Sequence, residues 1–432
     1  MSSKAKPSDA AGGTALVPRL RFPEFQEACA WESASGDELF QQINNREAQP
    51  GLPVLAITQE HGAIPRHMID YHVSVTDKSL EAYKEVQPGD FVISLRSFEG
   101  GIEFSSYHGI CSPAYVILRK RGRLSEMFYR QHFKSHDFIR QLTRNLEGLR
   151  DGKMISYKQF SELKLLKPTL PEQEQIADCL DTADALLAAQ GRKLAALRAH
   201  KKGLMQQLFP QEGECRPRLR FPEFDKAGDW EATPLSKLVG TLDAGVSVNS
   251  GDRPAMSGEL GVLKTSAVTS GVFEPNQNKV VLDKEQIRRV KEPVRADTVI
   301  ISRMNTPALV GANAYVKDDY PNIFLPDRLW AAKPRPGAYM RFIALVLGSD
   351  VGRAALANLA GGSSDSMKNI AKPRVFELLV MVPSLSEQRR IADCLTSLDD
   401  LMALEARKLD ALKTHKKGLT QQLFPRGEGA GA

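Results

Sequence analysis

Basic and polar side chains gather in two stretches of this sequence. The stretch from Arg140 to Lys167 carries seven Lys and Arg residues against three acidic ones, with Tyr157 and Phe160 between them. The stretch from Gly361 to Asn369 is rich in Gly, Ser, Asn and Lys, which lets backbone and short side chains approach phosphate groups. Both patterns favour contact with nucleic acid, although charged loops are often only solvated.

Two arginines end similar apolar runs, Gly89–Arg96 and Ala296–Arg303. An arginine in that position can reach guanine in a major groove, where its guanidinium pairs with two acceptors. The candidate DNA-contacting residues are Arg96, Ser97, Arg150, Lys153, Tyr157, Lys158, Arg303, Asn305, Ser363, Ser364, Lys368 and Asn369.

No sequence pattern here is typical of a catalytic site. The chain has no GxxxxGK[ST] loop, no GxGxxG after a strand, no HExxH and no GxSxG. The stretch Asn305–Ala308 lacks the second Pro and the aromatic residue of the Asn/Asp-Pro-Pro-aromatic motif of amino-methyltransferases. Three histidines, His61, His67 and His72, share one stretch without metal-ligand spacing, and the five cysteines form no CxxC pair. We therefore expect no catalytic residue and no metal site.

Length and composition indicate a globular protein of two or three domains. The chain has 432 residues, of which 42% are apolar and 25% charged. No apolar run approaches the roughly 18 residues that span a bilayer, which favours a cytoplasmic location. The net charge of +6 permits a polyanionic partner without requiring one, so the distribution of charge matters more than its total.

One long helical pattern occurs twice, and it must position everything else. The stretch Pro171–Pro210 returns as Ser386–Pro425 at a constant offset of 215 residues. Apolar residues recur in alternating steps of four and three, the heptad seam of a coiled coil. The seam residues of the first copy are Ile176, Leu180, Ala183, Leu187, Gln190, Leu194, Leu197, Lys201, Leu204 and Leu208, and their equivalents run from Ile391 to Leu423. A repeat of this length predicts two long helices that pair with each other.

The two polar positions of each seam suggest a register for an antiparallel pair. In one register Gln190 lies beside Lys416, and Lys201 beside Glu405. Buried polar pairs cost stability but can specify register. We therefore take these four residues as the expected markers of the register.

A second repeat opens each half of the chain. The phrase PRLRFPEF occurs at Pro18–Phe25 and at Pro217–Phe224, and each copy is followed by Trp-Glu. Between phrase and helix the halves diverge, with strand-like runs, Gly and Pro turns, and helical stretches at Ser125–Asn145 and Tyr339–Leu359. The predicted fold class is α+β, with two mixed domains separated by an antiparallel coiled coil in an internal pseudo-two-fold repeat. The expected segments are a disordered leader (1–17), domain 1 (18–168), helix 1 (169–210), a linker (211–216), domain 2 (217–383), helix 2 (384–425) and a disordered tail (426–432).

The helix repeat resembles a known family. Its pattern Glu-Gln-x-x-Ile-Ala-x-x-Leu, ending in His-Lys-Lys-Gly-Leu-x-Gln-Gln-Leu-Phe-Pro, is similar to the conserved regions of specificity (S) subunits of type I restriction–modification systems. The divergent segments resemble the two target recognition domains of that family. The resemblance covers nearly the whole chain.

The resemblance implies a non-catalytic DNA-binding role. Each recognition domain would read one half of a bipartite, asymmetric site in double-stranded DNA, and the helices would set the gap and dock two methyltransferase (modification) subunits. Restriction and translocase subunits would complete the assembly. The resemblance implies no cofactor on this subunit, with S-adenosylmethionine, ATP and Mg²⁺ expected on its partners.

Two alternatives stay open at this point. The chain could be a coiled-coil scaffold whose two domains bind proteins or glycans, or an S-like subunit of a fused methyltransferase–nuclease. The sequence does not identify the recognised bases or the gap length.

Overall fold

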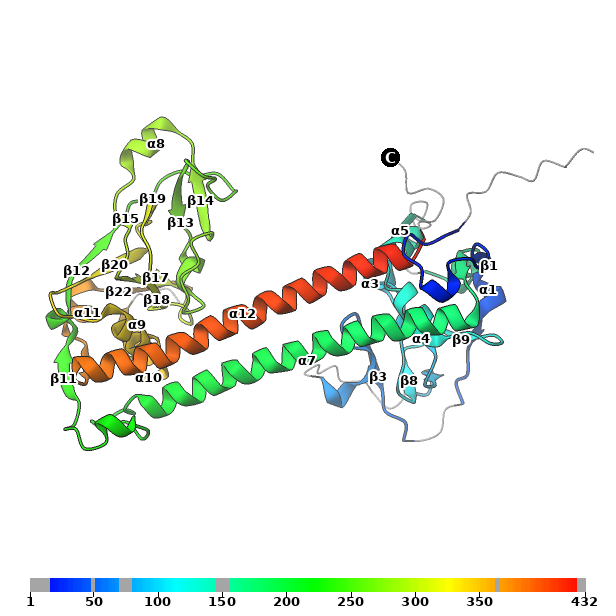
Figure 1. Ribbon diagram of the computed structural model, residues 1–432, viewed down its shortest axis with the longest axis horizontal. Coiled ribbons are helices and arrows are strands. Elements are labelled where there is room, and N and C mark those ends of the chain that lie inside the picture. Colours follow the sequence, from blue (N-terminus) through cyan, green and yellow to red (C-terminus); the bar gives the residue numbers. More distant parts are fainter. Residues whose placement is uncertain (1–15, 48–50, 70–79, 145–154, 362–365, 426–432) are drawn as a thin grey trace, which may run out of the picture. The chain divides into compact units, whose positions relative to one another are not determined.

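The computed structural model describes residues 16–47, 51–69, 80–144, 155–361 and 366–425 (Figure 1). The chain forms two compact units, which we call unit 1 (residues 1–191 and 407–432) and unit 2 (residues 192–406). Two helices are common to both, α7 (Leu170–Leu208) and α12 (Leu385–Leu423). Each unit therefore consists of one mixed domain and half of each long helix.

Both domains contain the same main sheet. Its strand order is β2-β9-β6-β7 in unit 1 and β12-β20-β16-β18 in unit 2, and all neighbours are antiparallel. The strands are β2 (Phe40–Ile43), β9 (Val116–Lys120), β6 (Phe91–Ile93), β7 (Glu103–Phe104), β12 (Val239–Ala244), β20 (Leu329–Pro334), β16 (Thr298–Ser302) and β18 (Asn313–Val316). Strands β6 and β16 occupy the same place, which confirms the predicted equivalence of the runs that end at Arg96 and Arg303.

A second sheet is also shared. In unit 2 its order is β14-β13-β19-β15, and in unit 1 the pairs β3–β4 and β5–β8 are joined by a parallel bridge between Val54 and Ile110. The strands are β14 (Asn278–Val281), β13 (Leu260–Leu263), β19 (Tyr320–Phe324), β15 (Pro293–Val294), β3 (Leu55–Thr58), β4 (Gly62–Pro65), β5 (Lys84–Val86) and β8 (Gly109–Cys111). The internal repeat thus extends to the parts whose sequences diverge.

The main sheet lies in the middle of each domain. Phe91 and Ile93 of β6 face one core cluster, which includes the helices, while Val92 faces the other cluster with the second sheet. In unit 2, Val299 and Ile301 of β16 face the cluster that includes the helices, while Ile300 faces the cluster with the second sheet. Because both faces of the central strand are buried, its sequence is a continuous apolar run without alternation. Each domain is therefore a stack of helices, main sheet and second sheet.

The helical layer is broken at a serine in both domains. The stretches expected to be helical form the pairs α4 (Glu126–His132) with α5 (His136–Arg144), and α9 (Met340–Gly348) with α10 (Asp350–Asn358). At the second break the Ser349 hydroxyl accepts a hydrogen bond from Gly352 N at 3.1 Å and so caps α10. In unit 1 the Ser135 hydroxyl accepts from Phe138 N at 3.4 Å. Both predicted stretches are therefore helical, and each is divided into two helices because a serine at this position can cap a new helix N-terminus.

His132 lies in an aromatic core where neither ring nitrogen has a hydrogen-bond partner. The rings of Phe128, Phe138 and Phe424 have their centroids 5.2–6.2 Å from its own. Burial lowers the pKa of His132 to about 3 from an ordinary value of 6.5. The imidazole is therefore neutral in the folded protein at any pH well above 3.

This histidine predicts a loss of stability in mild acid. Below pH 6.5 His132 binds a proton in the unfolded chain but not in the folded protein. The free energy of unfolding therefore falls as the pH falls, until about pH 3. Between pH 6.5 and pH 5 the cost is about 2 kcal/mol. We expect His132→Phe to reduce the loss of unfolding free energy between pH 7 and pH 5 by about that amount, measured by urea denaturation. Equal pH dependence in both proteins would show that His132 is not the responsible group.

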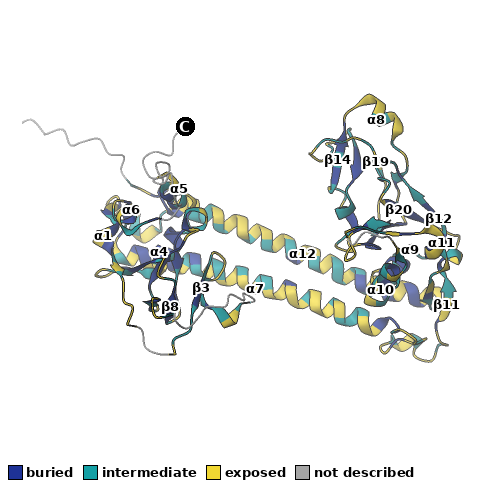
Figure 2. Cartoon of the chain, turned by 180° about the vertical axis from the view of Figure 1, so that it is seen from behind, coloured by how far each residue is buried: buried dark blue, intermediate teal, exposed yellow. Residues whose placement is uncertain are grey.

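The two long helices have the predicted seam. Every seam residue from Ile176 to Leu208 and from Ile391 to Leu423 is buried or half-buried, while the outer faces are largely exposed (Figure 2). In unit 1, Ile176 and Leu180 share a cluster with Leu423. In unit 2, Leu208 shares one with Ile391 and Leu395. Within each unit the halves of α7 and α12 therefore pack antiparallel.

The predicted register was wrong. Lys416 Nζ lies 2.5 Å from Asp184 Oδ1 in unit 1, and Lys201 Nζ lies 2.6 Å from Asp399 Oδ1 in unit 2. Both aspartates stand six residues before the expected partners Gln190 and Glu405, next to the seam residues one heptad earlier. A shift of one heptad leaves the apolar seam in phase, so the seam alone does not choose between these registers. Lysine also reaches past the seam to a flanking carboxylate.

Glu405 has a different lysine partner from the expected one. Its carboxylate is buried in the seam and lies 3.0 Å from Lys193 Nζ. Gln190, the fourth expected marker, is half-buried on the α7 seam. Three ion pairs therefore mark the register. In each pair a residue that flanks the seam contacts a residue within it: Asp184 with Lys416, Lys193 with Glu405, and Asp399 with Lys201.

The repeated phrase forms a clasp on the long helices. We call Arg21–Trp31 in unit 1 and Arg220–Trp230 in unit 2 the clasps. Arg21 donates to both oxygens of Glu172, in the first turn of α7, at 2.8 and 2.9 Å. The indole of Trp31 donates to the same carboxylate at 3.0 Å, and just before the clasp Leu20 N donates to Gln422 O of α12 at 3.0 Å. One short segment thus fastens the beginning of one helix to the end of the other.

The unit 2 clasp repeats these contacts. Arg220 donates to both oxygens of Glu387 at 2.7 Å, and Trp230 donates to it at 3.4 Å. Leu219 N donates to Gln207 O at 2.9 Å. After each clasp the chain enters a strand that pairs with the strand before the long helix, β1 (Glu32–Ser35) with β10 (Lys164–Lys167), and β11 (Glu231–Pro234) with β23 (Leu379–Val382). The domain is therefore attached to its helix by both of its ends.

The structured part of unit 1 begins before residue 18, where the expected leader (1–17) was to end. Leu16 forms a β-bridge with Trp31, so the leader does not extend to residue 17. The remainder of the expected leader (1–15) and the expected tail (426–432) lie outside the described residues.

Candidate nucleic-acid interface

Four of the candidate residues meet in unit 2. The strand β17 (Met304–Asn305) pairs with β22 (Lys368–Ile370), which also pairs with β21 (Ala360–Gly361). This register places Asn305 opposite Lys368 and Met304 opposite Asn369, and Ile370 N donates to Arg303 O at 2.9 Å. The small sheet thus brings Arg303, Asn305, Lys368 and Asn369 together at the end of β16.

Arg303 has the geometry of a recognition residue. Its guanidinium carbon lies 5.6 Å from the centroid of the Trp330 ring, a stacking contact that restricts the side chain. Its Nε is buried and has no hydrogen-bond partner. With Trp330, Asn369 and Lys372 it lines a surface concavity. The stacking contact restricts the orientation in which the guanidinium of Arg303 can meet an external acceptor at this concavity.

Three candidates, of which Asn305 also belongs to the group in unit 2, form hydrogen bonds inside the protein. Ser97 is 1% exposed and its hydroxyl accepts a hydrogen bond from Ser94 N at 2.8 Å. Asn305 is 8% exposed, donates to the Ser302 hydroxyl and accepts from Thr306 N. Tyr157 donates to Phe40 O at 3.0 Å. These side chains stabilise turns and strand ends, so the structure does not support them as DNA contacts.

The remaining candidates of unit 1 are less closely grouped. Arg96 is exposed and precedes the short helix α3 (Ser97–Gly100), while Lys158 is exposed on α6 (Tyr157–Ser161). No hydrogen bond or ion pair between these two is found in the part of the chain that the structure describes. Arg150, Lys153, Ser363 and Ser364 lie outside the described residues.

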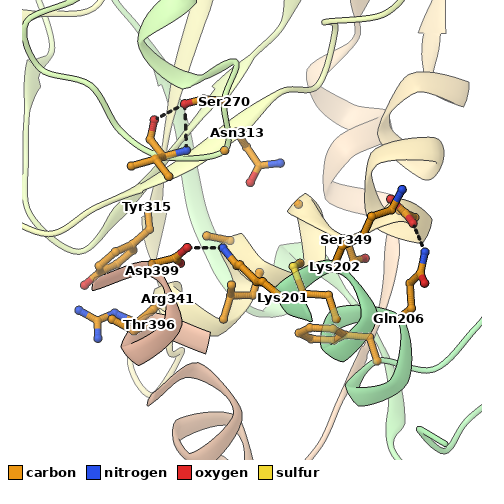
Figure 3. Close-up of a pocket in the computed structure, with 18 of the residues that line it drawn as sticks. Lys201, Lys202, Gln206, Ser270, Asn313, Tyr315, Arg341, Ser349, Thr396 and Asp399 are labelled. Atoms are coloured by element: carbon orange, nitrogen blue, oxygen red, sulfur yellow. Dashed lines mark hydrogen bonds and ion pairs between the residues drawn. The ribbon is translucent and has the colours of Figure 1, made fainter. Parts of the chain in front are cut away.

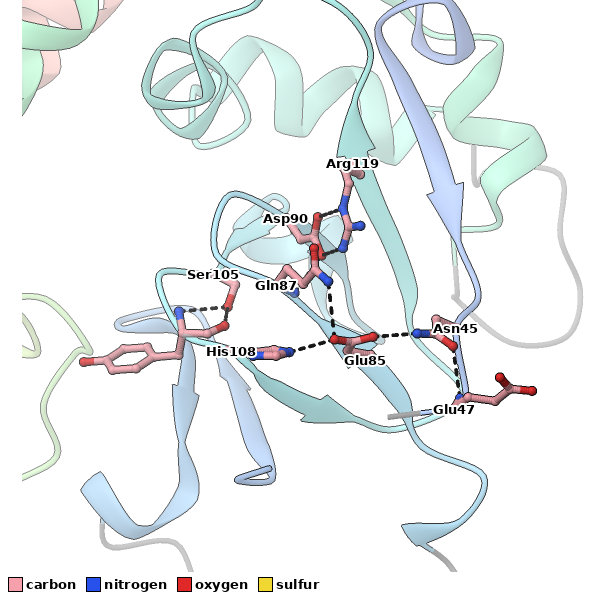
Figure 4. Close-up of polar contacts among 9 residues, drawn as sticks. Asn45, Glu47, Glu85, Gln87, Asp90, Ser105, His108 and Arg119 are labelled. Atoms are coloured by element: carbon pink, nitrogen blue, oxygen red, sulfur yellow. Dashed lines mark hydrogen bonds and ion pairs between the residues drawn. The ribbon is translucent and has the colours of Figure 1, made fainter. Parts of the chain in front are cut away.

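A polar network in unit 1 ties the second sheet to the strand edges (Figure 4). Glu85 of β5 lies at its centre and accepts from Asn45 at 2.5 Å and from Gln87 at 3.3 Å, while its other contact is His108 at 2.7 Å. The hydrogen bond to His108 lowers the pKa of Glu85. The network contains a carboxylate and a histidine but no nucleophile in contact with them, so its geometry indicates a structural role.

Neither a metal site nor a membrane span emerges from the described ranges. No cluster of three or more His, Cys, Asp or Glu side chains there is arranged to hold a metal ion. No helix among the described residues has the length and apolar character needed to cross a bilayer.

The comparisons with known proteins agree with this architecture. Residues 239–414 match a family model described as type I restriction modification DNA specificity domain. The chain is 24% identical to the type I restriction enzyme MjaVIII specificity subunit of Methanocaldococcus jannaschii over 94% of this chain and 93% of that protein. It is 22% identical to the putative type I restriction enzyme MjaX specificity subunit of the same organism, over 79% and 76%.

Solved structures share the fold. The crystal structure of a type I restriction–modification system S subunit from M. genitalium superposes with a TM-score of 0.54 at 16% identity, covering 95% of this chain and 99% of that one. A chain from a structure of complex assembly and conformational transition of the type I R-M system gives a TM-score of 0.52 at 14% identity, covering 91% and 97%. The chain therefore shares its fold with these two solved structures. Over most of its length the chain is similar to specificity subunits of type I restriction–modification systems, and residues 239–414 carry the match to the DNA specificity domain.

Proposed function

We propose that each domain reads one half of a bipartite, asymmetric site in double-stranded DNA, and that the paired helices set the gap between the halves. The observation that carries this proposal is the duplication itself. In both units the same stack of helices and sheets is attached to the long helices by an equivalent clasp, while the residues at the ends of β6 and β16 differ. A conserved frame with different side chains at equivalent edges suits two different half-sites.

Sequence reading would depend on arginine, asparagine and lysine at those edges. Arg303 offers donors to guanine N7 and O6, and exposed Asn369 beside it offers an amide suited to adenine. Lys158 and Lys372 suit phosphate contacts, which add affinity without sequence preference. In unit 1, Arg96 lies one residue beyond the position equivalent to Arg303, which Leu95 occupies.

Catalysis would belong to partner subunits. We infer two methyltransferase subunits and further restriction and translocase subunits, with S-adenosylmethionine, ATP and Mg²⁺ bound by those partners in the cytoplasm. Exposed leucines on the long helices offer docking points, since Leu186 is 53% exposed and its repeat equivalent Leu401 is 37% exposed. Large exposed apolar side chains at equivalent positions suit two copies of one partner.

A matched pair of substitutions tests the reading of two half-sites. In the complex with the modification subunits, Arg303→Ala is expected to weaken binding by about 1–3 kcal/mol and to relax base preference in one half-site. Arg96→Ala is expected to relax the other half-site. The measurement is affinity for duplexes in which each base pair is varied in turn.

Lys158→Ala serves as the control, because losing a phosphate contact weakens all sequences alike and makes binding less dependent on salt. Relaxation of both half-sites by either arginine substitution would contradict independent reading. So would an unchanged base preference in both variants.

A further inference from the structure

Unit 2 contains a cavity of about 410 Å³ that DNA reading at the strand edges does not use. Its walls are the C-terminal turns of α7, the first turns of α10, the strand β18 and the loop around Ser270 (Figure 3). The size is within the range of small-molecule sites. The cavity lies beside the sequence His-Lys-Lys-Gly-Leu that recurs in both long helices.

The cavity is rich in positive charge. Arg198, Lys202, Lys317 and Arg341 line it, and among the described residues no carboxylate is paired with any of them. The two carboxylates that also line it are already engaged, since Asp399 accepts from Lys201 at 2.6 Å and Asp350 accepts from Gln206 at 3.0 Å. Four neighbouring cations repel one another until an anion joins them. The N-terminus of the nine-residue helix α10 adds a positive end to the same wall.

A buried acceptor in the wall has no partner. Asn313 is 3% exposed, and its Oδ1 forms no hydrogen bond. Its Nδ2 donates to the carbonyl of Gly311 at 3.3 Å, which can only accept, so the orientation of the amide is determined. Figure 3 shows this amide pointing into the space between Tyr315, Ser349 and Lys202. Buried acceptors rarely remain unpaired, so a ligand that carries an N–H donor fits this position.

The rest of the lining is apolar and partly aromatic. Met205, Phe209, Val272 and Leu345 contribute carbon surface. The guanidinium of Arg341 lies 5.2 Å from the centroid of the Tyr315 ring, which holds a flat cationic surface at the rim. A ligand here therefore needs an apolar or planar body in addition to negative charge.

We propose that this cavity binds a nucleotide whose base carries an amino group. The phosphate contacts the lysine and arginine cluster, the ring packs on the apolar lining, and an exocyclic N–H donates to Asn313 Oδ1. A base in an intact duplex is stacked and paired and cannot enter such a cavity. The nucleotide is therefore either free or part of a single strand.

The test is calorimetric titration of the full chain with adenosine monophosphate, inorganic phosphate, adenosine and a short oligo(dA). The expected result is that adenosine monophosphate binds at least tenfold more tightly than phosphate or adenosine alone. Combining Lys202→Gln with Arg341→Gln should weaken adenosine monophosphate at least tenfold. The matched control is Lys417→Gln, the repeat equivalent of Lys202 in α12, which should change the affinity less than twofold.

Oligo(dA) distinguishes the two sources of the nucleotide. Tighter binding of oligo(dA) than of the monophosphate, lost in the double variant, assigns the site to single-stranded DNA, and the reverse assigns it to a free nucleotide. Asn313→Asp should abolish binding of either, because it introduces a negative charge where the acceptor stands. If that variant loses its folded circular dichroism signal, Lys317→Gln at the rim replaces it and should weaken binding. Equal affinities for phosphate and adenosine monophosphate, or an unaffected double variant, would overturn the proposal.

Discussion

Glu387→Gln is expected to destabilise unit 2 by about 3–5 kcal/mol, because it leaves a buried arginine without its counter-charge. The side chains of Arg220 and Glu387 are only 5% and 1% exposed. Glutamine keeps the size of the side chain and can still accept from Trp230, so the change removes little except the charge. The loss is large because water does not reach Arg220 to replace the carboxylate.

Hydrogen–deuterium exchange of the full chain can locate this effect as well as detect it. Exchange should rise in residues 192–208 and 385–406, the helix halves of unit 2. Glu172→Gln should produce the equivalent rise in unit 1, where Arg21 and Glu172 are 8% and 1% exposed. The control is Glu223→Gln, which removes a 3.0 Å ion pair to Arg390 between side chains that are each about half exposed. That variant should leave exchange unchanged, since exposed pairs stabilise little. Equal effects from the buried and the exposed pair would show that burial of the clasp does not matter.

Removing one heptad from each long helix is expected to change the gap in the DNA target by about three base pairs. Seven residues shorten a helix by about 10.5 Å, and a base pair rises about 3.4 Å. Residues 187–193 and 402–408 are equivalent in the repeat, and their removal preserves the phase of both seams. They also include both members of the Lys193–Glu405 pair, so no buried carboxylate is left alone.

Affinity for the original site should then fall by about a thousandfold or more, toward the non-specific level, while both half-sites stay the same. Selection from duplexes with a randomised gap measures this directly. Deleting residues 187–193 alone is the control, and it should destabilise the protein because Glu405 loses its lysine and the two seams no longer match in length. Selection of the original gap by the double deletion would contradict a spacing role for the helices.

The heptad period and the internal repeat predicted the arrangement of helices and domains, because both can be recognised in the sequence without knowing which distant residues are in contact. The seam from Ile176 to Leu208 was readable since a coiled coil needs only local spacing. The equivalence of β6 and β16 was readable since a strand buried on both faces is a continuous apolar run. The register was not readable, because Asp184 and Asp399 stand beside the seam and a heptad shift leaves the seam unchanged.

The interface residues were harder to predict because a polar side chain can form hydrogen bonds either within the protein or with an external partner, and the sequence does not distinguish the two. Ser97, Tyr157 and Asn305 looked like contacts but hold backbone groups of their own domain. Arg303 was proposed from its place at a strand end, and only the structure shows its stacking on Trp330 and its unused Nε. The clasp was visible as a repeated phrase, but its function depends on glutamates that are 151 and 167 residues away in the sequence.

The division of the chain between the units has a consequence for the order of folding during synthesis. Unit 2 is one continuous segment, residues 192–406, and all of it has left the ribosome before the last turns of α12 appear. Unit 1 is discontinuous, and its core includes Leu423 and Phe424 near the end of the chain. The core of unit 1 therefore stays incomplete until Leu423 and Phe424 have been synthesised. Because contacts distant in sequence form slowly, this half is the one most exposed to aggregation and most in need of a chaperone.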